Sequence, residues 1–102
     1  MLNFTYQEAE KAFREMLEPY EGEFGVDRGN IVFKGRSKDG REFRAGIAEF
    51  DEFISVDGEL KEGDCRGFGS PCFDMDRLKE EIEYAIRFCG MIKREATQLK
   101  LW

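Results

Sequence analysis

The sequence predicts a small α+β domain with two layers, in which an antiparallel sheet of three to four strands is flanked by an N-terminal helix and a long C-terminal helix. Apolar residues recur at helical spacing near both ends of the chain, and strand-like segments alternate with glycine-containing turns between them. The order is therefore α-β-β-β-α, and packing both helices on one face of the sheet buries all three apolar surfaces. We expect one domain over residues 1–102.

The first helix is predicted over residues 6–18. Thr5 and Glu8 have the spacing of a capping box, in which each side chain accepts a hydrogen bond from the backbone amide of the other residue. Pro19 and Gly22 mark the end of the helix. One apolar stripe runs along it and consists of Ala9, Ala12, Phe13, Met16, Leu17 and Tyr20.

The clearest β element is a hairpin over residues 30–47, and burial selects its register. A two-residue turn at Asp39-Gly40 would bring charged and apolar side chains onto one face of the sheet. A three-residue loop at residues 38–40, with Gly40 in the left-handed conformation, shifts the pairing by one residue and separates them. The apolar face then carries the pairs Ile31/Ile47, Phe33/Ala45 and Gly35/Phe43, and the other face carries Lys34/Arg44 and Arg36/Glu42.

The remaining elements follow in order. Residues 53–56 predict a third strand that ends in a turn at Asp57-Gly58, and residues 24–26 predict a short strand paired to residues 31–32. The glycine-rich segment 61–73 is expected to be a loop. The second helix begins at Ser70-Pro71 or, with the stronger cap, at Asp74. Its stripe continues toward the C-terminus through Leu78, Ile82, Ala85, Ile86, Cys89, Ile92, Ala96 and Leu99.

The chain is acidic, with a formal net charge of −6. This balance argues against direct binding to duplex nucleic acid, because such binding needs a basic surface that displaces counterions from phosphates. An acidic surface can instead compete with nucleic acid for the basic groove of another protein. No signal segment precedes the first helix and no apolar run approaches the ~20 residues that span a bilayer. We therefore expect a cytoplasmic protein without membrane contact.

Charge is also segregated along the chain, because a basic hairpin is followed directly by an acidic stretch. In the preferred register Lys34 and Arg44 stand opposite each other, which favours an anion-binding spot unless Asp57 or Glu52 of the next strand neutralises it. The candidate anion-binding residues are Lys34, Arg36, Arg44 and Arg66. The candidate acidic face consists of Glu49, Asp51, Glu52, Asp57 and Glu59.

Catalytic and metal-binding patterns are not found in the sequence. The chain contains no histidine, and its carboxylates lie in no recognisable motif, so we do not expect an enzyme. The gap between Cys65 and Cys72 differs from the spacing of structural zinc sites, and Cys89 falls on the buried helix stripe. The loop at residues 63–72 lacks the Lys-Ser/Thr ending of a phosphate-binding loop. No metal or cofactor is predicted.

A second stripe on the C-terminal helix is the candidate interface, and it consists of Tyr84, Phe88, Met91 and Trp102. It lies roughly 130° from the buried stripe at 100° per residue, so a single sheet does not bury both. Either the first helix packs against this flank, or the flank is an exposed aromatic patch of the kind that forms a homodimer or partner interface.

These features favour a small, acidic, non-enzymatic interaction module, which we expect to act as an inhibitor or adaptor of a larger protein that handles nucleic acid. The partner would contact the acidic face or the aromatic stripe. The alternative is a binder of a small anion, such as a nucleotide, through the basic hairpin spot. No motif in the chain resembles that of a known family.

Overall fold

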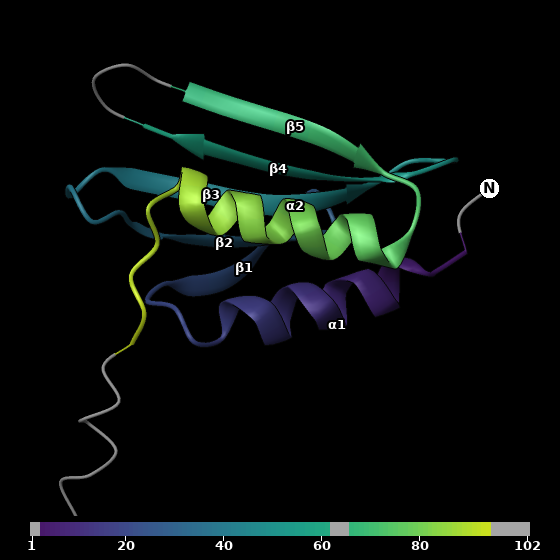
Figure 1. Ribbon diagram of the computed structural model, residues 1–102, viewed down its shortest axis with the longest axis horizontal. Coiled ribbons are helices and arrows are strands. Elements are labelled where there is room, and N and C mark those ends of the chain that lie inside the picture. The colour runs from purple at the N-terminus through teal and green to yellow at the C-terminus, as the bar shows by residue number, and fades with distance from the viewer. Residues whose placement is uncertain (1–2, 62–65, 95–102) are drawn as a thin grey trace, which may run out of the picture.

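The structure is a computed structural model that describes residues 3–61 and 66–94, and it contains two helices and one five-stranded antiparallel sheet (Figure 1). The strands are joined in sequence order, β1-β2-β3-β4-β5. Both helices lie on one face of the sheet and begin at the same end of the molecule (Figure 1), so the predicted α+β class is confirmed. The elements are α1 (Tyr6–Leu17), β1 (Glu23–Asp27), β2 (Asn30–Arg36), β3 (Glu42–Glu49), β4 (Ile54–Leu60), β5 (Arg66–Cys72) and α2 (Met75–Phe88).

Helix α1 begins with the predicted capping box. The amide of Glu8 donates to Thr5 Oγ1 at 3.1 Å, and the amide of Thr5 donates to Glu8 Oε1 at 2.8 Å. These two bonds satisfy amides that have no partner within the first helical turn. The helix then buries its predicted stripe against the sheet, including Phe13 and Leu17.

The hairpin of β2 and β3 has the predicted register. Lys34 pairs with Arg44 and Gly35 with Phe43, and Gly40 is left-handed with φ 85° in the connecting loop. Because side chains alternate between the faces of a strand, this pairing places the phenylalanines of both strands under the helices and the charged side chains on the open face.

The sheet has five strands rather than three or four, which corrects two expectations. Strand β4 continues through Asp57 and Gly58, where a turn was predicted, and β5 occupies residues 66–72 of the predicted loop. A Cβ on Gly58 would lie 2.8 Å from Phe68 Cε1 and 3.4 Å from Cys89 Sγ. Gly58 is therefore a strand residue whose missing side chain admits the Phe68 ring of β5, a role that only the tertiary packing reveals.

Helix α2 ends at Phe88, well before the C-terminus to which its apolar stripe was extended. Gly90 is left-handed with φ 61°, and the amides of Gly90 and Met91 donate to the carbonyls of Arg87 and Ile86. This pattern is a Schellman motif, which stops a helix at a left-handed glycine. Residues 91–94 then run beside the segment that follows α1, where Tyr20 and Lys93 form an isolated β-bridge. The predicted helix beyond Arg94 lies outside the described residues.

The core lies between the sheet and the two helices, and its largest fully buried side chains include Phe13, Phe33, Phe43, Leu78 and Ile82. This packing leaves two distinct ends. The β3–β4 turn, the β5–α2 junction and both helix N-termini lie at one end, and the β2–β3 loop, the helix C-termini and residues 91–94 lie at the other (Figure 1). Within the described part of the chain, no helix is long and apolar enough to cross a membrane.

Candidate functional site

The predicted basic spot lies on the open face of the sheet, and carboxylates flank it on both sides. Lys34 pairs with Arg44 in the centre, Glu23 of β1 stands opposite Lys34, and Glu59 of β4 stands opposite Arg44. One row across four strands therefore reads negative, positive, positive, negative. Cross-strand pairs of opposite charge offset the repulsion between the two central cations.

Arg44 also forms an ion pair with Asp27 of β1. The predicted neutralising residues were Asp57 and Glu52, which follow the hairpin in sequence, whereas the ion-pair partner precedes the hairpin. Asp57 is half-buried and lies opposite Gly46 on the neighbouring strand. Burial raises its pKa, and the nearby Arg44 charge acts in the opposite direction.

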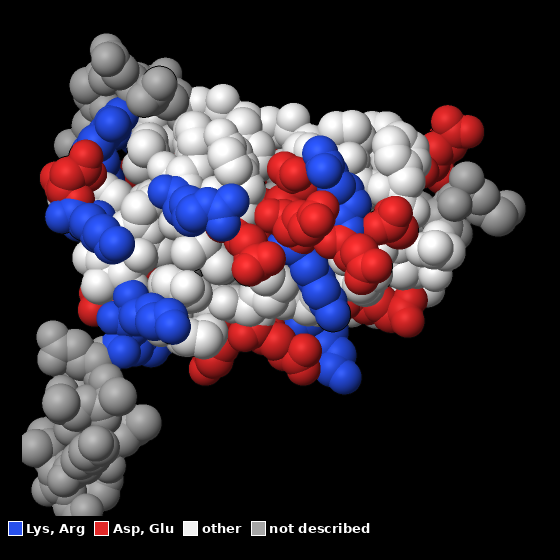
Figure 2. All heavy atoms as spheres, in the orientation of Figure 1, with Lys and Arg blue, Asp and Glu red and all other residues white. Residues whose placement is uncertain are grey.

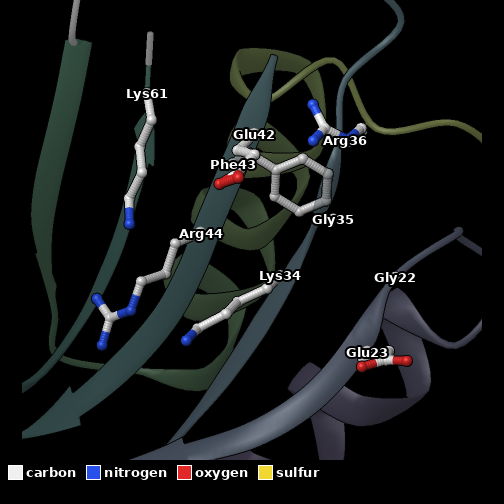
Figure 3. Close-up of a pocket in the computed structure, with 9 residues that line it drawn as sticks. All are labelled: Gly22, Glu23, Lys34, Gly35, Arg36, Glu42, Phe43, Arg44 and Lys61. Atoms are coloured by element: carbon white, nitrogen blue, oxygen red, sulfur yellow. The ribbon is translucent and has the colours of Figure 1, made fainter. Parts of the chain in front are cut away.

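Around these residues the open face is hollowed into a depression of about 410 Å³ (Figure 3). The side chains of Lys34, Arg44 and Lys61 extend toward the same side of it, and Arg36 points away from them (Figure 3). Nη1 of Arg36 donates to the carbonyl of Gly40 at 2.8 Å. Lys61 was not among the sequence candidates because only the β3–β4 pairing brings it beside the hairpin. The side chain of the fourth candidate, Arg66, lies outside the described residues.

The predicted acidic face is divided between two places. Glu49, Asp51 and Glu52 lie at the end of β3 and in the following turn, and all three are exposed. Asp57 and Glu59 lie on β4, where they pair with Gly46 and Arg44 of β3. Only the first group forms an acidic surface without a basic strand beside it.

An aromatic cluster lies within this acidic surface. The rings of Phe50 and Phe53 stack with centroids 4.9 Å apart, and Phe73 lies 5.7 Å from Phe53. Phe50 is 50% exposed and Phe73 is 54% exposed. The amide of Phe50 donates to the Phe53 carbonyl at 2.9 Å, which closes the β3–β4 turn between the two rings. We call these three residues the aromatic end patch.

This patch was not predicted from the sequence. Phe53 was assigned to the third strand and Phe73 to the end of a long loop, so nothing placed them together. The usable signal was the pair Phe50 and Phe53 on either side of Asp51-Glu52, because two aromatics that flank a short acidic turn stand next to each other when the turn closes.

The predicted helix stripe of Tyr84 and Phe88 packs against an aromatic residue of β5. The ring of Phe68 on β5 packs edge-on against Tyr84 at 4.8 Å and against Phe88 at 5.0 Å. Met91 follows the helix and is only 3% exposed. The Phe68 ring of β5, a strand that the prediction lacked, thus covers part of this flank. Tyr84 remains 41% exposed, and Trp102 lies outside the described residues.

The described residues contain no cluster of histidine, cysteine, aspartate and glutamate side chains that could hold a metal ion. Cys72 and Cys89 are free and buried. Burial raises the pKa of the Cys72 thiol to about 11 and that of Cys89 to about 12, so neither is a reactive thiolate near neutral pH. Cys65 lies outside the described residues.

Comparison of the chain with protein-family models, curated proteins and solved structures finds no match.

Proposed function

We propose that this protein is a non-enzymatic protein-binding module that contacts its partner through the aromatic end patch and the carboxylates around it. The observation that carries this proposal is the exposure of Phe50 and Phe73, two large apolar rings held in a three-ring cluster at the surface. Exposed apolar clusters with a polar rim are typical of interfaces, whereas single exposed apolar residues are common on any protein.

The rings of the cluster need little rearrangement in order to bind a partner. Full burial of a phenylalanine side chain is worth about 1.5–3 kcal/mol, and Phe50 and Phe73 keep roughly half of that area available. The closed turn and the stacking with Phe53 already restrict the rings. Binding of a partner therefore buries apolar surface while the rings of the cluster lose little side-chain entropy, which is the property of an interface anchor.

The rim indicates the chemistry of the partner. Exposed carboxylates surround the cluster, from the β3–β4 turn and from the start of α2: Glu49, Asp51, Glu52, Asp74 and Asp76. Figure 2 shows acidic side chains toward the same end on the helix side of the molecule, with basic side chains among them. Complementarity then favours a basic surface with an apolar recess on the partner. Proteins that handle nucleic acid carry such basic surfaces, so we propose that the module acts on one of them as an inhibitor or adaptor.

A paired-variant binding experiment tests this function. Phe50→Ser/Phe73→Ser removes the exposed rings of the patch, and Tyr84→Ser removes the exposed aromatic residue of the helix stripe as a matched control. A protein captured by the wild-type chain is purified and its affinity is measured by calorimetry at two salt concentrations. We expect the patch variant to lose binding by at least tenfold and the control to keep it. Loss with Tyr84→Ser alone would assign binding to the helix stripe instead.

The alternative function, binding of a small anion through Lys34, Arg36, Arg44 and Arg66, has weaker support. The row containing Lys34 and Arg44 ends in Glu23 and Glu59, and Asp27 pairs with Arg44. The double charge reversal Lys34→Glu/Arg44→Glu tests it directly, by loss of binding to an anion at an unchanged melting temperature. A homodimer, a cytoplasmic location and the absence of duplex binding remain predictions.

A further inference from the structure

A second depression, of about 350 Å³, lies at the end of the molecule opposite the aromatic end patch. Its polar walls are Lys38 from the β2–β3 loop, Arg87 from the last turn of α2 and Lys93 from the C-terminal segment. Its apolar surface includes Tyr20, Ile86 and Ile92. Three cationic side chains from three separate segments therefore surround one apolar floor.

Backbone hydrogen bonds fix the segments that carry these cations. The amide of Lys38 donates to the Gly90 carbonyl at 2.9 Å, and the amide of Glu21 donates to the Ile92 carbonyl at 2.8 Å. The bridge between Tyr20 and Lys93 joins the C-terminal segment to the chain that follows α1. The cations thus project from a framework that does not depend on their own side chains.

The charge around this depression is unusual for so acidic a chain. No carboxylate lines it, and within residues 3–61 and 66–94 neither lysine nor Arg87 takes part in an ion pair. Asp39, the acidic neighbour of Lys38, accepts a hydrogen bond from the Ser37 hydroxyl. Figure 2 shows basic side chains gathered toward this end of the helix face. The hairpin spot, in contrast, has a carboxylate beside each of its central cations.

The carbonyl end of α2 works against an anion, because the helix dipole is negative there. The carbonyls of Ile86 and Arg87 already accept hydrogen bonds from the Schellman amides, and the Gly90 carbonyl, beyond the helix, accepts one from the amide of Lys38. The three full side-chain charges outweigh the partial negative charge of the helix end, which is roughly half an elementary charge.

We propose that this depression binds a small ligand in which a phosphate group is linked through a sugar to a planar ring with apolar faces, the chemical class of a nucleoside monophosphate. Lys38, Arg87 and Lys93 contact the phosphate oxygens through charge-assisted hydrogen bonds. Tyr20, Ile86 and Ile92 provide the surface on which the ring rests. The site is independent of the proposed protein-binding function, since it lies at the other end of the molecule and shares no residue with the aromatic end patch.

Calorimetric titration with adenosine monophosphate tests the proposal, with adenosine as a second probe. Lys38→Ala/Lys93→Ala removes two of the three cations and keeps both backbone amides. Lys11→Ala/Lys79→Ala is the matched control, because it removes two exposed lysines from the helices, away from both basic depressions. We expect saturable binding to the wild-type chain, about a hundredfold loss in the first variant and less than a twofold change in the control.

Arg87→Gln provides a second test that leaves both lysines in place, and we expect it to weaken binding about tenfold. Melting curves of all three variants show whether a loss of binding reflects a loss of folding. The proposal is overturned if the wild-type chain shows no saturable binding, if adenosine binds as tightly as its monophosphate, or if the control variant loses binding instead. None of these results bears on capture of a protein by the aromatic end patch.

Discussion

The guanidinium of Arg44 on β3 pairs with the carboxylate of Asp27 on β1, although β2 lies between these two strands. Val32 of β2 lies in the same row as Gly46 and is buried on this otherwise open face. The row between Arg44 and Asp27 on this face contains Gly25, Val32 and Gly46, and the two glycines have no side chain. This ion pair offsets part of the repulsion between Lys34 and Arg44, which stand opposite each other in the hairpin.

Asp27→Asn is expected to change stability only slightly. The side chains of Arg44 and Asp27 are 24% and 48% exposed, so solvent screening limits the pair to about 0–1 kcal/mol of unfolding free energy. Urea denaturation of the variant measures this change. A loss well above that range would mean that the pair holds β1 on the sheet. If the hairpin spot binds anions, the same variant binds them more tightly, because Arg44 loses its partner.

Asp57→Asn is expected to stabilise the protein at neutral pH. Burial raises the pKa of Asp57 above its ordinary value of 3.8, so the folded state holds the charged carboxylate at a cost. The wild-type chain avoids this cost below pH 3.8 and incurs it as the pH rises through the folded-state pKa. The difference in unfolding free energy between variant and wild type therefore grows from pH 4 to pH 7 in urea denaturation. A pH-independent difference would contradict the assignment.

Gly58→Ala is expected to destabilise the protein by about 1–3 kcal/mol through overpacking. The new methyl group would lie 2.8 Å from the Phe68 ring. That ring has little freedom to move because it lies against both Tyr84 and Phe88. The matched control is Gly69→Ala on β5, where a Cβ meets nothing within 4 Å and we expect a change below about 0.5 kcal/mol. Equal losses in both variants would indicate a strand effect rather than a contact with Phe68.

Cys72 and Cys89 are expected to resist alkylation in the folded protein at pH 8. Both thiols are fully buried, and burial raises the pKa values to about 11 and about 12. Iodoacetamide labelling followed by mass spectrometry of the peptides measures each thiol separately, with a urea-unfolded sample as the positive control. Rapid labelling of Cys72 under native conditions would show that β5 detaches from the sheet.

The hairpin illustrates what could be predicted. The register of β2 and β3 follows from alternation of apolar and charged residues around a left-handed glycine, and those signals all lie in the single segment 31–47. The start of α1 follows likewise from the spacing of Thr5 and Glu8. Such interactions are local, so a short window of sequence contains both partners.

Gly58 and Gly90 illustrate features of the fold that could not be predicted from the sequence. Gly58 follows an aspartate and so has the appearance of a turn residue, yet it lies within β4. A side chain at this position would need the space that the Phe68 ring occupies. Gly90 ends α2, while Met91 and Ile92 continue the apolar spacing and imitate a longer helix. In both cases the meaning of the glycine depends on a contact or a conformation that apolar periodicity does not encode.

The candidate sites also differ in whether they depend on local sequence or on tertiary packing. Composition and local pattern were sufficient for the α+β class, the acidic character and the opposition of Lys34 and Arg44. The aromatic end patch joins Phe50 and Phe73, and the cationic depression joins Lys38 and Lys93, so each brings together residues distant in the chain. The pairing of β5 with β4 brings Phe73 beside Phe53, and the end of α2 with the segment after it brings Arg87 and Lys93 beside the β2–β3 loop. Their positions follow from the meander order of the strands and the common direction of the helices, which place every second connection at the same end of the molecule.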